Sequence, residues 1–351
     1  MFILLIKKRV GLLDIYLNGS KLIFLHLLRM KNMNWILKPV KNWAWQKAVL
    51  AIMFLPLLLP LRSAAQQDPV YTQYLTNMST IQPAYAGISG FLNISALSRA
   101  QWVGWEGAPN TNTVTAHIPL KTYNVGLGAT FINDKWGPIR QNSLYFDYSY
   151  RVRTGEREFL AFGVKAGFNV YQAFLTDLDI NDPDDQMFAT DVSFRFMPNI
   201  GAGVMWHGER FFVGASTPKF LKNRITDETT GVVYREVNHI YLMGGYVFFL
   251  SENLKLKPTI LYRWSQNTPS YADFGLNFLL YDRVWAGATY RYQNSYALTF
   301  QFRVNTQLTF GYAYDLTTFH KGNVNSGTHE FMISYEFTSS RRSRVSSPRY
   351  F

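Results

Sequence analysis

The chain has 351 residues, no cysteine and a formal net charge of +12. Ten of its 35 basic residues and one of its 23 acidic residues lie within residues 1–65, so the remainder holds 25 basic and 22 acidic residues and is only +3. This charge gives no support to nucleic-acid binding, and the lack of cysteine excludes both disulfide bonds and a lipidated cysteine anchor.

Residues 1–65 have the features of an export signal. Lysines precede an uncharged apolar run over residues 48–61, and the small residues Ser63-Ala64-Ala65 follow it, which predicts cleavage near Gln66. The run has 14 residues and two prolines, whereas a spanning helix needs roughly 20 apolar residues. A buried core helix is the alternative, but the cleavage-like site favours a signal peptide. Since an export signal does not need the upstream residues, we expect translation to begin at Met30 or Met33.

After the signal peptide we expect a periplasmic N-terminal segment over residues 66–90 and then strands over residues 91–337. Apolar and polar residues alternate along these strands with a period of two. From Leu144 to Val152, for example, the even positions are aromatic or aliphatic, while the odd positions are Tyr145, Asp147, Ser149 and Arg151. The same alternation is seen over residues 296–304, 308–315 and 330–337.

Both a secreted β-sandwich and a membrane β-barrel would show this alternation. The runs of about 9 to 11 residues fit a tilted membrane crossing, whereas sandwich strands usually have about five or six residues. Charged residues on the inner face would also be buried at high cost in a sandwich core. We therefore predict an all-β fold, a transmembrane antiparallel β-barrel in the outer membrane. About 14 strands are expected, starting near Phe91, Thr111, Tyr123, Ile139, Arg157, Asn199, Arg210, His239, Asn253, Tyr271, Arg283, Ser295, Thr306 and Thr328.

Two gaps, at about 172–198 and 218–238, are too polar for lipid and are predicted to be loops on one rim. The first contains acidic residues from Asp177 to Asp185 that suggest a calcium site. Asp182 and Phe188 replace the glycine and glutamate of an EF-hand loop, which favours a solvated acidic loop. His207 and His239 are interpreted as hydrogen-bonded residues of the rim, since neither is part of a recognisable catalytic motif. We expect no catalytic residue, no cofactor and no metal.

Residues 338–351 are predicted to be a periplasmic tail. They carry four arginines and end in a second aromatic pair after Phe337, which closes the last alternating run. Arginine and aromatic side chains are enriched in the cores of protein interfaces, and Pro348 restricts the backbone beside them. We interpret the tail as a docking element for a protein partner, with a disordered stub as the alternative.

Short motifs also occur in a fixed order along residues 66–351. They are Gln66-Gln67-Asp68-Pro69, Tyr71-Thr72-Gln73-Tyr74, Gln82-Pro83-Ala84-Tyr85-Ala86-Gly87, Arg99-Ala100-Gln101-Trp102, Gly107-Ala108-Pro109-Asn110-Thr111, Gly311-Tyr312-Ala313-Tyr314-Asp315, Gly327-Thr328-His329-Glu330 and Ser347-Pro348-Arg349-Tyr350-Phe351. In these motifs the chain resembles the PorP/SprF family, with Gln82 at a position where asparagine is expected.

The resemblance implies a non-enzymatic outer-membrane component of the type IX secretion system of Bacteroidota, which exports proteins that carry a C-terminal sorting domain. It implies periplasmic and lipoprotein components of that machinery, outer-membrane lipid and sorting-domain cargo, such as gliding adhesins, as partners. A porin or fatty-acid-transporter-like channel is the alternative function. The signature segments become candidate partner contacts, namely Gln101, Trp102, Pro109, Pro348, Arg349, Tyr350 and Phe351.

Overall fold

The computed structural model describes residues 69–120, 124–178, 190–227, 231–266, 269–292, 294–317 and 327–337. The predicted signal peptide, the predicted translation start and the tail from residue 338 lie outside the described residues. Among the described residues, no helix has the length and hydropathy needed to cross a membrane.

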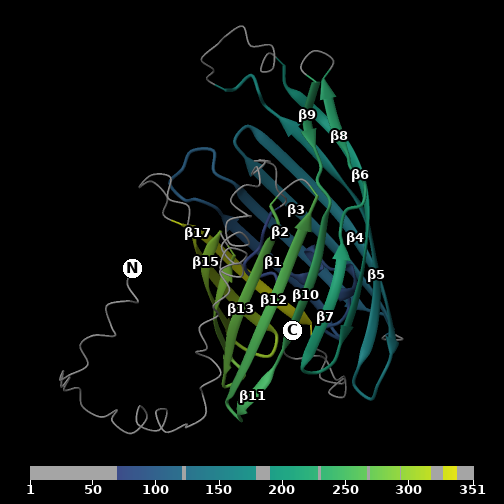
Figure 1. Ribbon diagram of the computed structural model, residues 1–351, viewed down its shortest axis with the longest axis vertical. Helices are drawn as coiled ribbons and strands as arrows, with labels where there is room; N and C mark the ends of the chain where they lie inside the picture. The colour runs from purple at the N-terminus through teal and green to yellow at the C-terminus, as the bar shows by residue number, and fades with distance from the viewer. Residues whose placement is uncertain are drawn as a thin grey trace, which may run out of the picture. The chain divides into compact units, whose positions relative to one another are not determined.

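Fourteen antiparallel strands form a closed barrel (Figure 1). The sheet closes because β1 pairs with β17, for example Ser95 with Ser334, and because β10 pairs with β12. The wall strands are β1 (Leu92–Ala100), β2 (Asn110–Pro119), β3 (Val125–Trp136), β4 (Ile139–Arg153), β5 (Phe159–Ala173), β6 (Val192–His207), β7 (Phe211–Thr217), β10 (His239–Tyr246), β12 (Leu254–Ser265), β13 (Tyr271–Leu280), β14 (Val284–Arg291), β15 (Ser295–Arg303), β16 (Leu308–Thr317) and β17 (Thr328–Phe337). The predicted fold class and strand count are confirmed.

The two faces of the wall have the chemistry expected of a barrel in lipid. On β4, Phe146 is 56% exposed on the outer face, whereas its neighbour Asp147 is 3% exposed on the inner face. On β15, the exposed positions include Tyr296, Leu298 and Phe300. The predicted inside–outside register is therefore confirmed, because period-two alternation places successive side chains on opposite faces.

The two rims of the barrel differ in the length of their connections. On one rim the turns at 120–124, 154–158, 208–210, 281–283 and 304–307 have three to five residues. The other rim carries the longest connections, with 18 residues from β5 to β6 and 21 from β7 to β10, although its β3–β4 and β14–β15 turns have only two and three residues. Outer-membrane barrels have short periplasmic turns and longer extracellular loops. By this general rule we assign the long-loop rim to the cell surface, which would place the start of β1 and the end of β17 on the periplasmic side.

Two predicted features were wrong. β6 begins at Val192 and not near Asn199, so the predicted loop over residues 172–198 is shorter than expected, and Pro198 lies within the strand. From residue 192 to residue 201, β6 pairs with β5 alone, and proline is tolerated where a strand has a neighbour on only one side. The second predicted loop, 218–238, contains a hairpin of β8 (Arg224–Asp227) and β9 (Gly231–Arg235). This hairpin stands at one end of the barrel, and the short strand β11 (Phe248–Ser251) lies at the other end (Figure 1).

Residues 69–91 lie inside the barrel, which differs from the expectation of a separate periplasmic segment. This stretch, called the plug below, contains two single-turn 3-10 helices, η2 (Met78–Thr80) and η3 (Pro83–Tyr85). Its apolar side chains are buried against inward-facing residues of the wall. The shared core comprises Tyr71, Tyr74, Met78, Ile81, Ala84, Tyr85 and Ile88 of the plug with Leu97, Ala161, Met205, Phe212, Tyr241, Met243, Leu261 and Met332 of the wall.

Candidate functional site: a plugged lumen

Glycines on the inner face of the wall make room for the plug. A Cβ atom at Gly163 of β5 would lie 2.6 Å from Ala84 Cα, and one at Gly126 of β3 would lie 2.6 Å from the Ala86 carbonyl carbon. Ordinary contacts of a Cβ atom begin at about 3.4 Å, so no other residue fits at either position without moving the plug backbone. The wall and the plug are thus complementary in shape.

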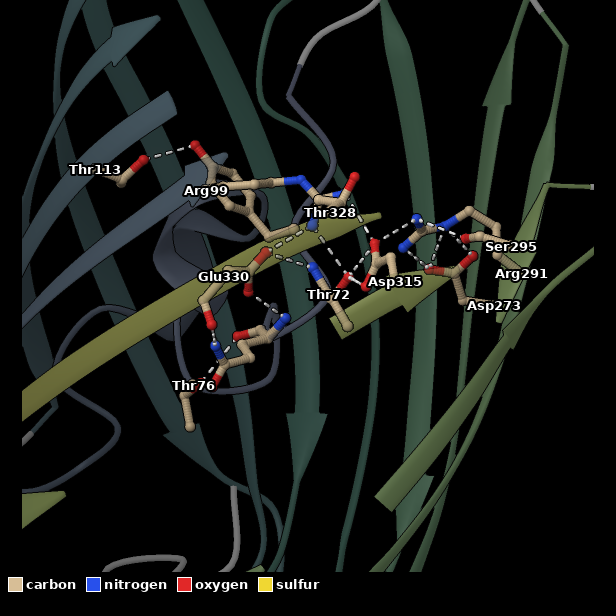
Figure 2. Close-up of polar contacts among 12 residues, drawn as sticks. Thr72, Thr76, Arg99, Thr113, Asp273, Arg291, Ser295, Asp315, Thr328 and Glu330 are labelled. Atoms are coloured by element: carbon tan, nitrogen blue, oxygen red, sulfur yellow. Dashed lines mark hydrogen bonds and ion pairs between the residues drawn. The ribbon is translucent and has the colours of Figure 1, made fainter. Parts of the chain in front are cut away.

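A buried ion network holds the N-terminal part of the plug (Figure 2). Arg99 of β1 lies between two carboxylates, with Nη2 2.8 Å from Asp315 Oδ2 and Nη1 3.0 Å from Glu330 Oε2. The Thr72 hydroxyl of the plug donates to Asp315 at 2.6 Å. The backbone N–H groups of Thr72 and Gln73 donate to the two carboxylate oxygens of Glu330, at 3.0 and 2.8 Å. The network therefore joins the plug to both sides of the β1–β17 seam.

A second arginine extends this network around the wall. Arg291 of β14 binds Asp273 of β13 through Nε and Nη2, each at 3.0 Å from a carboxylate oxygen. Its Nη1 lies 3.7 Å from Asp315, which links the two arginines through one carboxylate. Two guanidinium groups thus meet three carboxylates. Breaking a buried pair of this kind by removing one partner costs about 3–5 kcal/mol, so each member constrains the others.

Polar groups also hold the part of the plug nearer the short-turn rim. Lys165 of β5 donates to the Ser79 carbonyl at 3.0 Å and lies 2.8 Å from Asp147. Ser149 of β4 donates to the Ala86 carbonyl at 2.6 Å. The Gln82 side chain donates to wall carbonyls on β6 and β7, at 3.1 and 3.3 Å.

A cavity of about 370 Å³ opens above the plug at the long-loop rim. It is called the vestibule below. Pro69 and Val70, the first two described residues of the plug, form part of its lining. The wall and its loops contribute arginine, aspartate and aromatic side chains, namely Arg99, Trp102, Trp136, Tyr234, Arg235, Tyr271, Arg291 and Asp315. The ion network forms part of its floor.

Three of the predicted contact residues lie together at this mouth. Gln101, Trp102 and Pro109 line the vestibule, and the Gln101 N–H donates to the Pro109 carbonyl at 2.9 Å. The other four, Pro348, Arg349, Tyr350 and Phe351, lie outside the described residues. β17, which precedes them, ends at the opposite, short-turn rim.

The remaining candidates from the sequence show no catalytic arrangement. His207 is buried at the end of β6 and stacks on Phe159 at 5.8 Å between ring centroids, while His239 is buried at the start of β10. Most of the acidic run, residues 179–185, lies outside the described residues. Within the described ranges, no group of three or more His, Cys, Asp or Glu residues is placed to hold a metal ion.

Sequence reasoning missed the plug and its ion network. A signal existed in the glycines at inward positions of the alternation, because a small residue there marks a close approach of another backbone. A second signal was the placement of Arg99, Asp315 and Glu330 on inward positions, where a charge needs a partner. Neither signal identifies residues 69–91 as the segment that fills the lumen.

A closed antiparallel barrel with an apolar outer face, short turns on one rim and a lumen filled by its own N-terminal segment defines a plugged outer-membrane β-barrel protein. The chain belongs to the family described as Type IX secretion system membrane protein PorP/SprF, whose model matches residues 63–335. The family assignment and the outer-membrane location predicted from the sequence are thereby confirmed. Comparison with curated proteins finds no match.

Among solved structures, the chain is similar to outer-membrane barrels at low identity. The Acinetobacter baumannii outer membrane protein Omp33 shares 8% identity at a TM-score of 0.42, covering 71% of this chain and 100% of that one. The CymD monoaromatic hydrocarbon channel shares 10% at 0.43, covering 77% and 94%. A Pseudomonas aeruginosa FadL homologue shares 11% at 0.40, covering 70% and 89%. At these scores the likeness decides neither a ligand nor an activity.

Proposed function

We propose that this protein is a non-enzymatic component of the type IX secretion system that supports the export or surface attachment of sorting-domain cargo, such as gliding adhesins. Membership of the PorP/SprF family supports the secretion role. The observation that favours it over a passive channel is the plug, which fills the lumen from Tyr71 to Ile88 and is held by buried ion pairs and hydrogen bonds. A barrel closed in this way acts as a scaffold with two faces, one toward the periplasm and one toward the cell surface.

Deletion of the gene tests this function against a porin or fatty-acid-transporter-like channel. Surface display of sorting-domain cargo should fall in the deletion strain and return with the wild-type gene. The purified barrel should show little conductance in a planar bilayer. Normal cargo display together with lost solute uptake would contradict the secretion role and favour the channel.

We assign the periplasmic contacts to the tail over residues 338–351. Its composition of arginines and aromatics suits a protein interface, and β17 ends on the short-turn rim, which we assign to the periplasm. Deleting residues 347–351 should leave a folded barrel but reduce both cargo secretion and co-purification of periplasmic and lipoprotein components. Unchanged secretion would show that the tail is a stub, and failure to insert would show that it belongs to the assembly signal.

We assign the cell-surface contacts to the β1–β2 connection, residues 101–109. Trp102 and Trp105 are exposed there, and aromatic residues often dominate the binding energy of protein interfaces. Exchange of both tryptophans for serine should reduce retention of cargo at the surface while leaving the barrel folded. Phe310→Ser, which changes an exposed aromatic of the lipid-facing wall, is the control and should not reduce cargo retention in molecules that assemble.

A further inference from the structure

The plug runs through the lumen in the direction opposite to β1. Pro69 and Val70 line the vestibule at the long-loop rim, together with Gln101 and Thr328. Ala86 and Gly87 lie near the other end, where Gly87 approaches Pro119 at the end of β2. The chain then enters β1 at Leu92 on the short-turn rim. The first described residue of the exported chain is therefore at the cell-surface mouth.

From this direction we infer that the N-terminus of the mature protein is displayed at the cell surface, whereas its C-terminal tail leaves the barrel on the periplasmic side. Cleavage near Gln66 leaves three residues before Pro69, and an extended chain spans at most about 3.6 Å per residue. Three residues therefore reach about 11 Å, far less than the roughly 30 Å of a bilayer core. The free N-terminus cannot return to the periplasmic rim.

The packing of the plug also excludes a second path back through the lumen. Met78 and Ala84 are fully buried, and so is the Gln82 side chain that bonds the wall on two strands. Gly163 and Gly126 already bring the wall into contact with the plug backbone. Another extended chain would need to displace these contacts.

A consequence follows for the protein in the cell. The end of the plug at Pro69 and Val70 lies beside Gln101 and Pro109 of the β1–β2 connection, on the face that is available to an exported protein.

Cysteine labelling tests this topology cleanly, because the chain has no cysteine of its own. Gln67→Cys should react in intact cells with a polyethylene-glycol maleimide that is too large for general porins, seen as a gel shift. Trp105→Cys on the β1–β2 connection is the positive control and should react to a similar extent. Asn305→Cys on the turn between β15 and β16 should react only after the outer membrane has been permeabilised.

The orientation is overturned if Gln67→Cys stays unmodified in intact cells and reacts only after permeabilisation, as Asn305→Cys does. Reaction only after heat denaturation would also overturn it, because the N-terminus would then be enclosed. In unheated SDS gels a folded barrel is expected to migrate at a different position from the unfolded chain. Labelling of each variant is measured in the band of the folded barrel, so unfolded molecules are left out. Asp68→Cys gives a second reading at the adjacent residue should Gln67→Cys fail to assemble. The result does not depend on cargo, so it can fail while the secretion role holds.

Discussion

Gly163→Ala should release the plug. The added Cβ would lie 2.6 Å from Ala84 Cα and nearer still to the backbone of Pro83 and Ala84, whereas ordinary contacts begin at about 3.4 Å. The obstacle is the backbone of a short helical turn, which cannot rotate away like a side chain. Overpacking of this kind costs typically about 1–3 kcal/mol, and a shift of the turn also weakens the hydrogen bonds of Gln82. We expect the plug to leave its site more often than in the wild-type protein.

Conductance in a planar bilayer measures this release, since an emptied polar lumen is an aqueous path. Wild-type protein should be mostly closed, and Gly163→Ala should show frequent openings and faster proteolysis within residues 69–91. Gly244→Ala on β10 is the matched control, because it makes the same exchange in a strand of the wall where the nearest atom to the new Cβ is at an ordinary 3.5 Å. If Gly163→Ala stays as closed as wild type and as Gly244→Ala, the close fit of wall and plug is not what keeps the lumen shut.

Three further predictions concern the wall. Arg99→Met should lower the temperature at which the compact form is lost, because removing one partner of a buried ion pair costs about 3–5 kcal/mol, and an unchanged melting profile would contradict this. Phe300→Arg on the lipid face should harm assembly more than Gln301→Arg on the lumen face, with about 2–4 kcal/mol at stake near the bilayer midplane; equal amounts of folded protein would refute the difference. The barrel should resist SDS until boiled and migrate anomalously when unheated, because the closed sheet leaves no edge for detergent, and identical migration before and after boiling would argue against closure.

The strands of the wall could be predicted from the sequence because each one is recognised from the alternation of its own neighbouring residues. Each strand must present apolar residues to lipid at every second position, so the alternation around Phe146 or Phe300 gives both the strand and its orientation. The start of β6 was missed because residues 172–198 as a whole were interpreted as too polar for lipid, whereas β6 pairs with β5 from Val192 onward and extends beyond its pairing with β7. The length over which neighbouring strands pair is a property of the assembled sheet and cannot be recognised from the residues of one strand.

The plug could not be predicted because its structure depends on contacts with residues that are distant in the sequence. Residues 69–91 show no alternation and no long apolar run, so they read as an irregular connection. Their structure depends on groups far away in the sequence, such as Glu330, which accepts from the N–H of Gln73. The predicted contacts at Gln101, Trp102 and Pro109 rested on resemblance alone, and only the folded barrel brings them to one mouth.

The ion network around Arg99 also governs the order of events during folding. It links Thr72, which precedes the first strand, to Glu330 on the last strand, 258 residues further along the chain. Contacts between such distant residues form slowly, because the entropy of closing a very long loop is lost before any contact compensates for it. Until β17 has arrived, Arg99 has neither carboxylate and the plug has no anchor at Glu330. Closure of the seam and anchoring of the N-terminal part of the plug are therefore a single late step, and before it the barrel has an open edge. Cells that make this protein need to shield that intermediate from aggregation for as long as the last strand is missing.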